Sequence, residues 1–482
     1  MFMKKIKELA FYCIPMIMII CSFITIFENT IWVDESFSLE LAKHSMIDLI
    51  KLDSLDVHPP LYYIILKVGY IILGGIWDYI WIGKFMSLIP YIILILIGIF
   101  VIRKKFGETV AFYFNIFIVG MPQMLKYSTE IRMYSWGMLF VTCAFLQLAK
   151  ILSDNEDNRK AFCLLTVFSA LAAYTHYFAC ASAIVIYAEL FVLSLIRKSY
   201  GRIKSIIISG LGVVVLYLPW LFVFIAQTSA VKECYWISPV TLGTIKKNVL
   251  FLFNTKTIVE VAIVLLVIVA SIKAIKMFAK KENDIAICGI GVWGGTILLG
   301  VVLSLVIRPI FVSRYMMGAS ACFWLGIAIA LSKIEMDKLK KCIVVIASCI
   351  CIVESLLYVK NEFRTEKNLS DTYQVLNENI NAETKIISDY NQVQKVVSYY
   401  FPQNESIVVG ENLSDMTIMV YASCNLNRVE SVNDLDVDSF SNVLVLDKYG
   451  EINKELEKKV ESIEYLGNFK MDRYQFDVYY IK

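Results

Sequence analysis

Charged residues are scarce in this chain. Only 18% of its 482 residues are charged and 58% are hydrophobic, whereas soluble globular domains usually carry about a quarter charged residues. This shortage excludes an ordinary soluble protein and indicates a chain embedded in a lipid bilayer. The formal net charge is only +3, so the charge balance does not indicate nucleic-acid binding, and we expect no nucleic-acid partner.

Sequence motifs for metal binding and redox chemistry are also missing. The chain has three histidines and twelve cysteines, but no CxxC or HExxH motif and no His/Cys cluster with the spacing of a zinc site. Most of the cysteines fall within apolar segments, where cysteine behaves as a small hydrophobic residue. We therefore expect no structural zinc site. An internal repeat, which is frequent in secondary transporters, is also missing.

Apolar segments dominate the first three quarters of the chain. The first one follows Lys4, Lys5 and Lys7 and lacks the small-residue cleavage pattern of a signal peptide, so we expect it to remain as a span. About eleven segments are long enough to cross a hydrocarbon core of about 30 Å. These segments are 9–28, 80–102, 108–122, 134–150, 162–175, 178–196, 204–224, 257–275, 285–307, 314–332 and 340–358.

Basic loops predict the topology of these spans. Counting residues 61–74 as a full span would place Arg103, Lys104 and Lys105 outside, against the preference of basic residues for the cytoplasmic side. We therefore expect residues 36–50 and 59–74 to form juxtamembrane helices in the outer leaflet. The N-terminus is then cytoplasmic and the C-terminus extracytoplasmic. The basic loops that this topology places on the cytoplasmic side are 103–105, 197–204, 273–281 and 333–341.

The composition changes at about residue 360 and predicts a second domain. Residues 360–482 are rich in charged residues and Asn, with short β-like runs separated by helix-like stretches such as Glu451–Val460. We expect an all-α polytopic membrane domain over residues 1–359 and a small soluble α/β domain, outside the cytoplasm, over residues 360–482. The predicted strands are Lys385–Asp389, Ser406–Gly410, Thr417–Tyr421, Asn442–Leu446 and Gln475–Ile481.

Four clusters of ionisable and aromatic residues border the predicted membrane on its outer side. Charge is costly at this boundary, so a one-sided concentration indicates a functional site. Each cluster also has a purely structural interpretation: solvated loop carboxylates, an ion pair, a turn residue, an interfacial anchor, or a proline that starts a helix. The clusters contain Asp34, Glu35, Asp56 and His58, then Glu130, Arg132 and Tyr134, then His176, and finally Arg314 and Tyr315.

The order of these motifs resembles the C-superfamily of membrane glycosyltransferases. The similarity is to the branch of protein O-mannosyltransferases and aminoarabinose transferases, and it covers roughly residues 1–335. It is carried by Asp34-Glu35 after the first span, by Asp56-x-His58-Pro-Pro-Leu-Tyr-Tyr, by Tyr-Ser-x-Glu130-x-Arg132-x-Tyr134 and by Ser-Arg314-Tyr315. Members of this family carry two juxtamembrane helices in the first outer loop, which the basic loops predict here independently.

The resemblance implies an inverting transfer of sugar from a polyprenyl-phosphate donor to an acceptor hydroxyl. It implies that Asp34 acts as the base, with Glu130 as a second catalytic carboxylate, while Glu35 turns away or holds the loop. Which of Asp34 and Glu35 is the base stays open. The expected ligands of the donor phosphate are His58, Arg314 and Lys84, although relatives often have Arg where Lys84 stands and some have Lys where His58 stands. The expected supporting residues are Glu35, Asp56, Arg132, Tyr134, His176 and Tyr315.

Several features stay open at this stage. Asp34, Glu35 and Glu130 could supply oxygen ligands to Mg or Mn, but relatives include metal-independent members. The sugar is not indicated, and the acceptor could be a protein, a lipid or a cell-wall glycan. The composition suggests a bacterial plasma-membrane protein. The alternatives are a transporter or flippase for a lipid-linked sugar, and a sensor or scaffold that works through residues 361–482.

Overall fold

The chain folds into two compact units. Unit 1 comprises Met1–Ile24, Val57–Tyr62 and Lys84–Val359, and unit 2 comprises Thr25–Asp56, Tyr63–Gly83 and Lys360–Lys482. The computed structural model describes residues 2–153, 158–233, 237–253, 264–265, 267–270, 272, 284–334, 337–410, 413–435, 442–460 and 462–481. Two stretches, Thr25–Asp56 and Tyr63–Gly83, thus belong to the same unit as the C-terminal residues.

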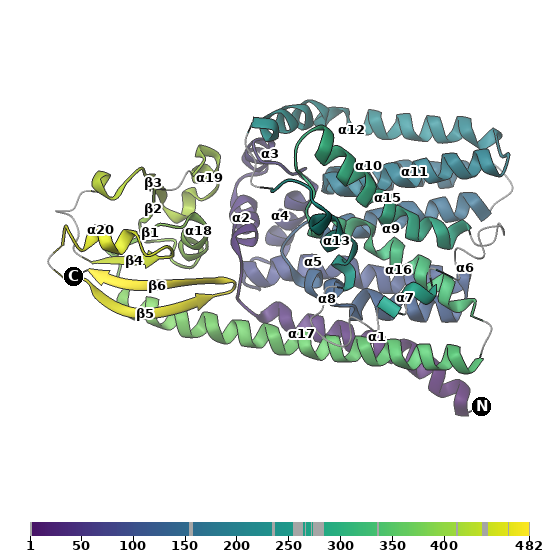
Figure 1. Cartoon of the computed structure of the whole chain (residues 1–482), viewed down its shortest axis with the longest axis horizontal. Coiled ribbons are helices and arrows are strands. Elements are labelled where there is room, and N and C mark those ends of the chain that lie inside the picture. The colour runs from purple at the N-terminus through teal and green to yellow at the C-terminus, as the bar shows by residue number, and fades with distance from the viewer. Residues whose placement is uncertain are drawn as a thin grey trace. The chain divides into compact units, whose positions relative to one another are not determined.

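Unit 1 is a bundle of helices. Helices α9 to α12 lie side by side, and α16 packs against α7, α9 and α15 (Figure 1). The helices are α1 Phe2–Ile24, α5 Tyr79–Ile97, α6 Arg103–Phe106, α7 Glu108–Gly120, α8 Pro122–Thr129, α9 Tyr134–Ser153, α10 Arg159–Thr175, α11 Tyr177–Ile196, α12 Gly201–Glu233, α13 Leu242–Val249, α15 Asp284–Val306, α16 Met317–Ser332 and α17 Asp337–Asn379, with a π-helix at Gly98–Ile102 and 3₁₀ turns at Phe251–Phe253 and Ser313–Met316. The first five residues of α5 and the last twenty of α17 belong to unit 2.

The predicted polytopic membrane domain is confirmed. Within the described residues, seven helices are long and apolar enough to cross a membrane, and three shorter apolar helices accompany them. Each predicted span coincides with a helix, except 257–275, which lies largely outside the described residues. Small residues bring two of the spans together: a Cβ on Gly289 of α15 would lie 2.9 Å from the Cα of Gly326 on α16. Such close backbone approach is typical of helix pairs in lipid.

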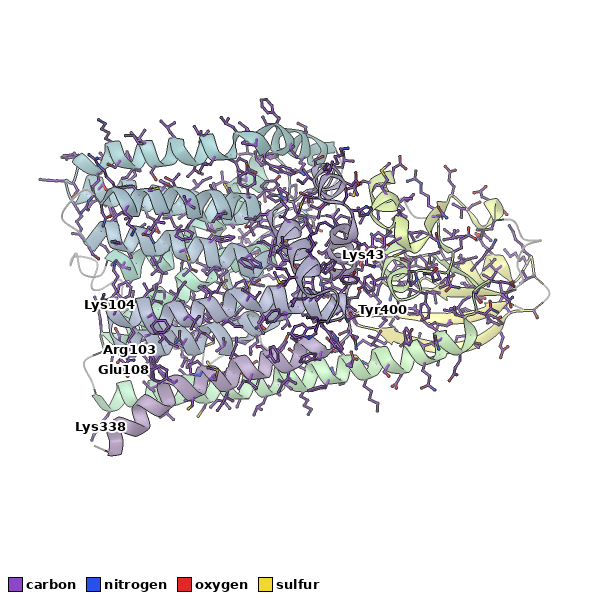
Figure 2. The ribbon with its side chains drawn as sticks, turned by 180° about the vertical axis from the view of Figure 1, so that it is seen from behind. Lys43, Arg103, Lys104, Glu108, Lys338 and Tyr400 are labelled. Atoms are coloured by element: carbon purple, nitrogen blue, oxygen red, sulfur yellow. The ribbon has the colours of Figure 1, made fainter. Side chains whose placement is uncertain are left out.

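Basic residues gather at one end of the bundle. Figure 2 shows Arg103, Lys104 and Lys338 together at that end, with Glu108 beside them. The Arg103 guanidinium lies 3.3 Å from the Glu108 carboxylate, at the first residue of α7. Glu108 is the first residue of α7, and α8 follows the last residue of α7. Residues directly after α8 therefore lie toward the end of α7 that is opposite Glu108.

The segment between α1 and α5 forms three helices of unit 2. They are α2 Val33–Lys43, α3 Met46–Ser54 and α4 Leu61–Leu73, of which the first two residues of α4 belong to unit 1. The predicted juxtamembrane helices are therefore present, but 36–50 is divided in two. The division occurs because Ser45 caps α3, its hydroxyl accepting the Asp48 backbone N–H at 3.2 Å.

Unit 2 also contains the predicted α/β domain. Its six-stranded sheet has the order β3-β2-β1-β4-β6-β5, and the first four strands are parallel, whereas β6 and β5 form an antiparallel hairpin, yellow in Figure 1. Buried aliphatic residues of β1, β4 and β6, such as Ile387, Val445 and Ile481, form one core. The elements are β1 Lys385–Ser388, α18 Asn391–Tyr400, β2 Ser406–Val409, α19 Asp415–Val420, β3 Leu426–Val429, β4 Val443–Asp447, α20 Ile452–Leu456, β5 Glu464–Met471 and β6 Tyr474–Ile481.

One predicted strand of this domain is wrong. Thr417–Tyr421 reads as a strand from its β-branched residues, but it lies mostly in α19. Ser414 caps this helix by accepting the Thr417 backbone N–H at 3.2 Å, which stabilises the helical start over the strand. Strands β3 and β5 were not predicted.

Replacing Asp389 by Asn is expected to change how the stability of unit 2 depends on pH. Burial disfavours the carboxylate and raises the pKa of Asp389 to about 7, and Asp447 acts in the same direction. The contribution of this carboxyl group to folding is therefore fully present below its unfolded-state pKa and is lost as the pH rises through about 7. The unfolding temperature of the wild type should rise relative to that of Asp389→Asn when the pH falls from about 8 to about 5.

Thermal unfolding in nanodiscs at several pH values measures this difference. Asp371→Asn removes an exposed carboxylate from α17 of the same unit and serves as the matched control. A constant difference between wild type and Asp389→Asn over this pH range would contradict the assignment.

Candidate functional site

Histidine and arginine side chains from all four predicted clusters meet in unit 1. The Arg132 guanidinium donates to Nε2 of His58 at 3.3 Å, and the ring centroids of His58 and His176 are 5.9 Å apart. Arg314 is close enough to His176 to act on it electrostatically. We call His58, Arg132, His176 and Arg314 the His/Arg cluster. Because Arg132 follows α8, the cluster lies at the end of α7 opposite Glu108.

His176 is a buried turn residue as well as a member of this cluster. It lies between α10 and α11, and its Nδ1 accepts the Phe178 backbone N–H at 3.0 Å, which caps α11. Burial lowers the pKa of His176 well below its ordinary value, and the neighbouring His58, Arg132 and Arg314 lower it further. The ring is therefore neutral, with its proton on Nε2, and can donate one hydrogen bond.

Aromatic rings surround the His/Arg cluster. The His176 ring lies 4.8 Å from Tyr315 and 5.6 Å from Tyr134, measured between centroids. The Arg314 guanidinium carbon is 5.8 Å from the centroid of Tyr315. Arg132 is 3% exposed. A ligand phosphate at this cluster would therefore meet cations whose surroundings are largely apolar, where charge attraction is stronger than in water.

Glu130 lies at the start of the same segment. It ends α8, and its backbone carbonyl accepts the Arg132 N–H at 2.7 Å, which fixes the turn between the two side chains. Tyr91 of α5 lies within electrostatic range of both Glu130 and Tyr358. The Tyr358 hydroxyl forms a hydrogen bond of 2.5 Å with the Thr129 hydroxyl. The buried phenol of Tyr91 and the half-buried phenol of Tyr358 therefore lie near the segment that carries the Glu130 carboxylate.

An apolar groove begins at this cluster. It is a cavity of about 470 Å³ whose lining is mostly aliphatic and aromatic, with His58, His176 and Tyr315 among its few polar residues. Its other polar residues include Tyr177 and Gln227, and the Tyr177 hydroxyl donates to Oε1 of Gln227. We call this cavity the apolar groove; its apolar walls include Ala181, Ile184, Leu221, Phe224, Leu299, Leu303, Ile307 and Ile310.

The two first-loop carboxylates have different environments in unit 2. Glu35 is 6% exposed, and its carboxylate accepts the Trp32 backbone N–H at 3.0 Å, which closes the first turn of α2. Asp34, one residue earlier, is half-buried. It acts electrostatically on Tyr421 and Tyr474. The geometry therefore gives Glu35 a structural role and leaves Asp34 as the more accessible acid.

The C-terminal residues hold the helix that carries Asp34. The Ser36 hydroxyl is 2.6 Å from the Tyr421 hydroxyl, the Val33 backbone N–H donates to the Tyr474 hydroxyl at 3.3 Å, and the Ser423 hydroxyl donates to the Glu40 carboxylate at 2.5 Å. These bonds join residues more than 350 positions apart in the sequence. The position of Asp34 within unit 2 thus depends on the C-terminal domain.

Two further predicted residues lie in α5 and in the turn before α4. Lys84 is buried in α5, one turn before Ser87, whose hydroxyl lies 3.4 Å from the Tyr62 hydroxyl. Asp56 lies in the turn between α3 and α4, and its backbone N–H donates to the Asp53 carbonyl at 3.0 Å. Within the residues that the structure describes, no group of three His, Cys, Asp or Glu side chains could hold a metal ion.

Sequence reasoning missed the residues that complete these sites. Tyr91, Tyr358 and the groove residues Tyr177 and Gln227 belong to spans whose apolar character hides single polar side chains. Tyr177 directly follows His176, so its position beside a predicted residue was the one available signal. Tyr358 had none, because its contact depends on the packing of α17.

Comparisons with known proteins show a shared fold. No protein-family model matches the chain, and no curated protein matches it significantly. The aminoarabinose transferase ArnT from Cupriavidus metallidurans, in the apo state, has a TM-score of 0.66 at 11% identity, over 97% of both chains. The same enzyme bound to undecaprenyl phosphate has a TM-score of 0.64, also at 11% identity over 97% of both chains. The chain therefore shares the fold of these ArnT structures, and the predicted polytopic helical fold with a small C-terminal α/β domain is confirmed.

Proposed function

We propose that this protein is a membrane glycosyltransferase that moves a sugar from a polyprenyl-phosphate carrier to an acceptor hydroxyl. The observation that carries the proposal is the apolar groove that begins at the His/Arg cluster. A polyprenyl phosphate has a long apolar tail and an anionic head. The apolar groove matches the tail, and the cations of the His/Arg cluster match the head. ArnT, which has the same fold, was crystallised with undecaprenyl phosphate and supports this class of donor.

The His/Arg cluster stabilises the leaving phosphate. As the bond between the sugar and the phosphate oxygen breaks, negative charge grows on the departing polyprenyl phosphate. Arg314 and Arg132 are permanently charged and can form paired hydrogen bonds with phosphate oxygens. The neutral His176 can donate from Nε2, and His58 is positioned by Arg132. Because these donors are fixed before the reaction, they stabilise the transition state more than the bound donor.

Asp34 acts as the base in this mechanism. The acceptor hydroxyl oxygen attacks the anomeric carbon from the face opposite the phosphate and inverts its configuration, while the hydroxyl proton passes to the Asp34 carboxylate. Glu130 orients the sugar or the acceptor by accepting a hydrogen bond, and Lys84 adds a further cation for the phosphate. Glu35 holds the first turn of α2, which is the role supported by its bond to the Trp32 backbone N–H.

The proposed site faces away from the cytoplasm. The gathering of Arg103, Lys104 and Lys338 at one end of unit 1 supports a cytoplasmic location for that end, because basic loops favour the cytoplasmic side. Residues 1–359 then form the membrane domain, with a cytoplasmic N-terminus, and residues 360–482 the extracytoplasmic domain. The contacts of this domain with α2 support a role in positioning Asp34.

Narrowing the apolar groove tests the proposal. Ala181 of α11 lines the groove, so Ala181→Phe should obstruct the carrier tail. We expect KM for an undecaprenyl-phosphate sugar to rise about tenfold, whereas a donor with only two isoprene units, which does not fill the groove, should be used as by the wild type. Turnover is measured as free polyprenyl phosphate released, by mass spectrometry.

Val192→Phe is the matched control, because Val192 lies on the exposed side of the same helix. This variant should use both donors normally. An equal loss with long and short donors in Ala181→Phe would count against the groove as the site of the tail.

A further inference from the structure

We propose that unit 2 contains a saccharide-binding pocket, a cavity of about 480 Å³ lined by Lys43, Asp78, Glu366, Tyr373, Tyr399 and Tyr400 among others. Ligand pockets in proteins commonly measure roughly 300–1,000 Å³. The lining residues come from the first-loop segments and from the C-terminal domain, and all of them belong to unit 2. Figure 2 shows Lys43 of α2 and Tyr400 of α18, which both line this pocket.

The polar part of the pocket is fixed before a ligand binds. Asp78 caps α5, and its Oδ1 accepts the Ile80 backbone N–H at 2.8 Å. Glu366 of α17 accepts the backbone N–H of Asn29 at 2.7 Å and its side-chain amide at 3.1 Å. A carboxylate has about four acceptor positions, so both groups retain capacity for the hydroxyls of a ligand. Fixed acceptors of this kind suit a ligand that carries several O–H donors.

The aromatic part of the pocket offers ring faces. Tyr373 stacks on Phe401 with 5.1 Å between ring centroids and 15° between ring planes, and 38% of its surface is exposed. The Lys43 ammonium lies 4.7 Å from the Tyr399 ring centroid, and the Tyr400 hydroxyl donates to the Asn29 carbonyl at 2.6 Å. Tyrosine combines an apolar ring, which can cover the C–H face of a sugar, with a polar hydroxyl.

Other ligand classes fit this lining less well. A lipid tail would require mostly apolar walls, as in the apolar groove, whereas this pocket has two carboxylates, an ammonium group and several hydroxyls. A phosphorylated ligand would require an excess of basic residues, but Asp78 and Glu366 outnumber Lys43. A neutral molecule with many hydroxyls and apolar ring faces satisfies both parts of the lining, and a saccharide is such a molecule.

Lys43 of this pocket and the proposed base Asp34 belong to the same helix, α2, so the bound saccharide would be the acceptor whose hydroxyl receives the transferred sugar. This role rests on the proposed function, whereas saccharide binding by the pocket does not. The sequence left a protein, a lipid and a cell-wall glycan open as acceptors. A saccharide pocket favours the glycan.

Binding of soluble saccharides to the full chain in nanodiscs tests the inference. The probes are chitotetraose, mannotetraose, maltotetraose and a peptide rich in Ser and Thr, and binding is followed by saturation-transfer NMR. We expect at least one tetrasaccharide to bind the wild type. Tyr373→Leu removes the exposed ring and should weaken this binding about tenfold. Asp78→Asn should also weaken it without unfolding α5, because Asn caps helices as well as Asp.

Tyr465→Leu is the matched control, because it removes an exposed tyrosine of β5 outside the pocket and should bind like the wild type. The inference is overturned if no tetrasaccharide binds, if only the peptide binds, or if Tyr373→Leu and Asp78→Asn both bind like the wild type. Asp34→Asn should retain saccharide binding. Sugar transfer without saccharide binding would contradict the saccharide pocket alone. Saccharide binding without sugar transfer would contradict the acceptor role together with the proposed function.

Discussion

Replacing Asp34 by Asn is expected to lower kcat for sugar transfer by about 10³-fold, a loss within the usual range for removal of a general base. Asn has nearly the shape of Asp, so α2 should keep its hydrogen bonds to Tyr421 and Tyr474. The variant should therefore fold and bind donor with unchanged affinity. The measurement is single-turnover transfer at saturating donor, together with donor binding at equilibrium.

A second carboxylate of the same unit separates loss of the base from a general effect of charge. Asp48→Asn, in α3 of the same unit, removes an exposed carboxylate and should leave kcat unchanged. Transfer by Asp34→Asn at more than a tenth of the wild-type rate would show that another group takes the proton.

Replacing Arg314 by Lys is expected to lower kcat/KM for the donor by about 10²-fold. Lysine keeps the positive charge but loses the planar guanidinium that pairs with two phosphate oxygens at once. It also loses the contact of the guanidinium with the Tyr315 ring, which orients the side chain beside His176. Initial rates with a series of donor concentrations measure the effect.

Arg308→Lys is the matched control for Arg314→Lys. Arg308 lies in the same connection between α15 and α16, six residues earlier, and is partly exposed like Arg314. The control should keep its wild-type kcat/KM. Equal losses in the two variants would indicate a general effect of charge or stability on this connection rather than a contact between Arg314 and the phosphate.

The membrane fold could be predicted because it depends on local properties of the sequence. Long apolar segments and basic loops require no knowledge of tertiary contacts, and they predicted the helices of unit 1 and the first-loop helices. Three members of the clusters predicted on one side of the membrane, His58, Arg132 and His176, do meet in the structure. A shared side alone, however, does not predict which of these side chains touch.

Which segments of the chain make up unit 2 could not be predicted, because this depends on contacts between distant residues. Asn29 and Glu366 are 337 positions apart, and nothing in either local sequence indicates their hydrogen bonds. The proposed saccharide pocket has the same origin, since its lining combines such distant segments. The strand predicted at Thr417–Tyr421 failed for a local reason: the cap at Ser414 outweighed the β-branched residues.

The most direct test of the proposed transferase function compares sugar transfer with transport of the lipid-linked donor in proteoliposomes. Purified protein is supplied with radiolabelled polyprenyl-phosphate sugar and a native envelope extract, and both the transferred label and the leaflet position of the donor are followed. If the protein is a transferase, label moves to an acceptor and free polyprenyl phosphate accumulates in the wild type but not in Asp34→Asn. Movement of intact donor between leaflets, without any transfer, would contradict the transferase function and identify a flippase.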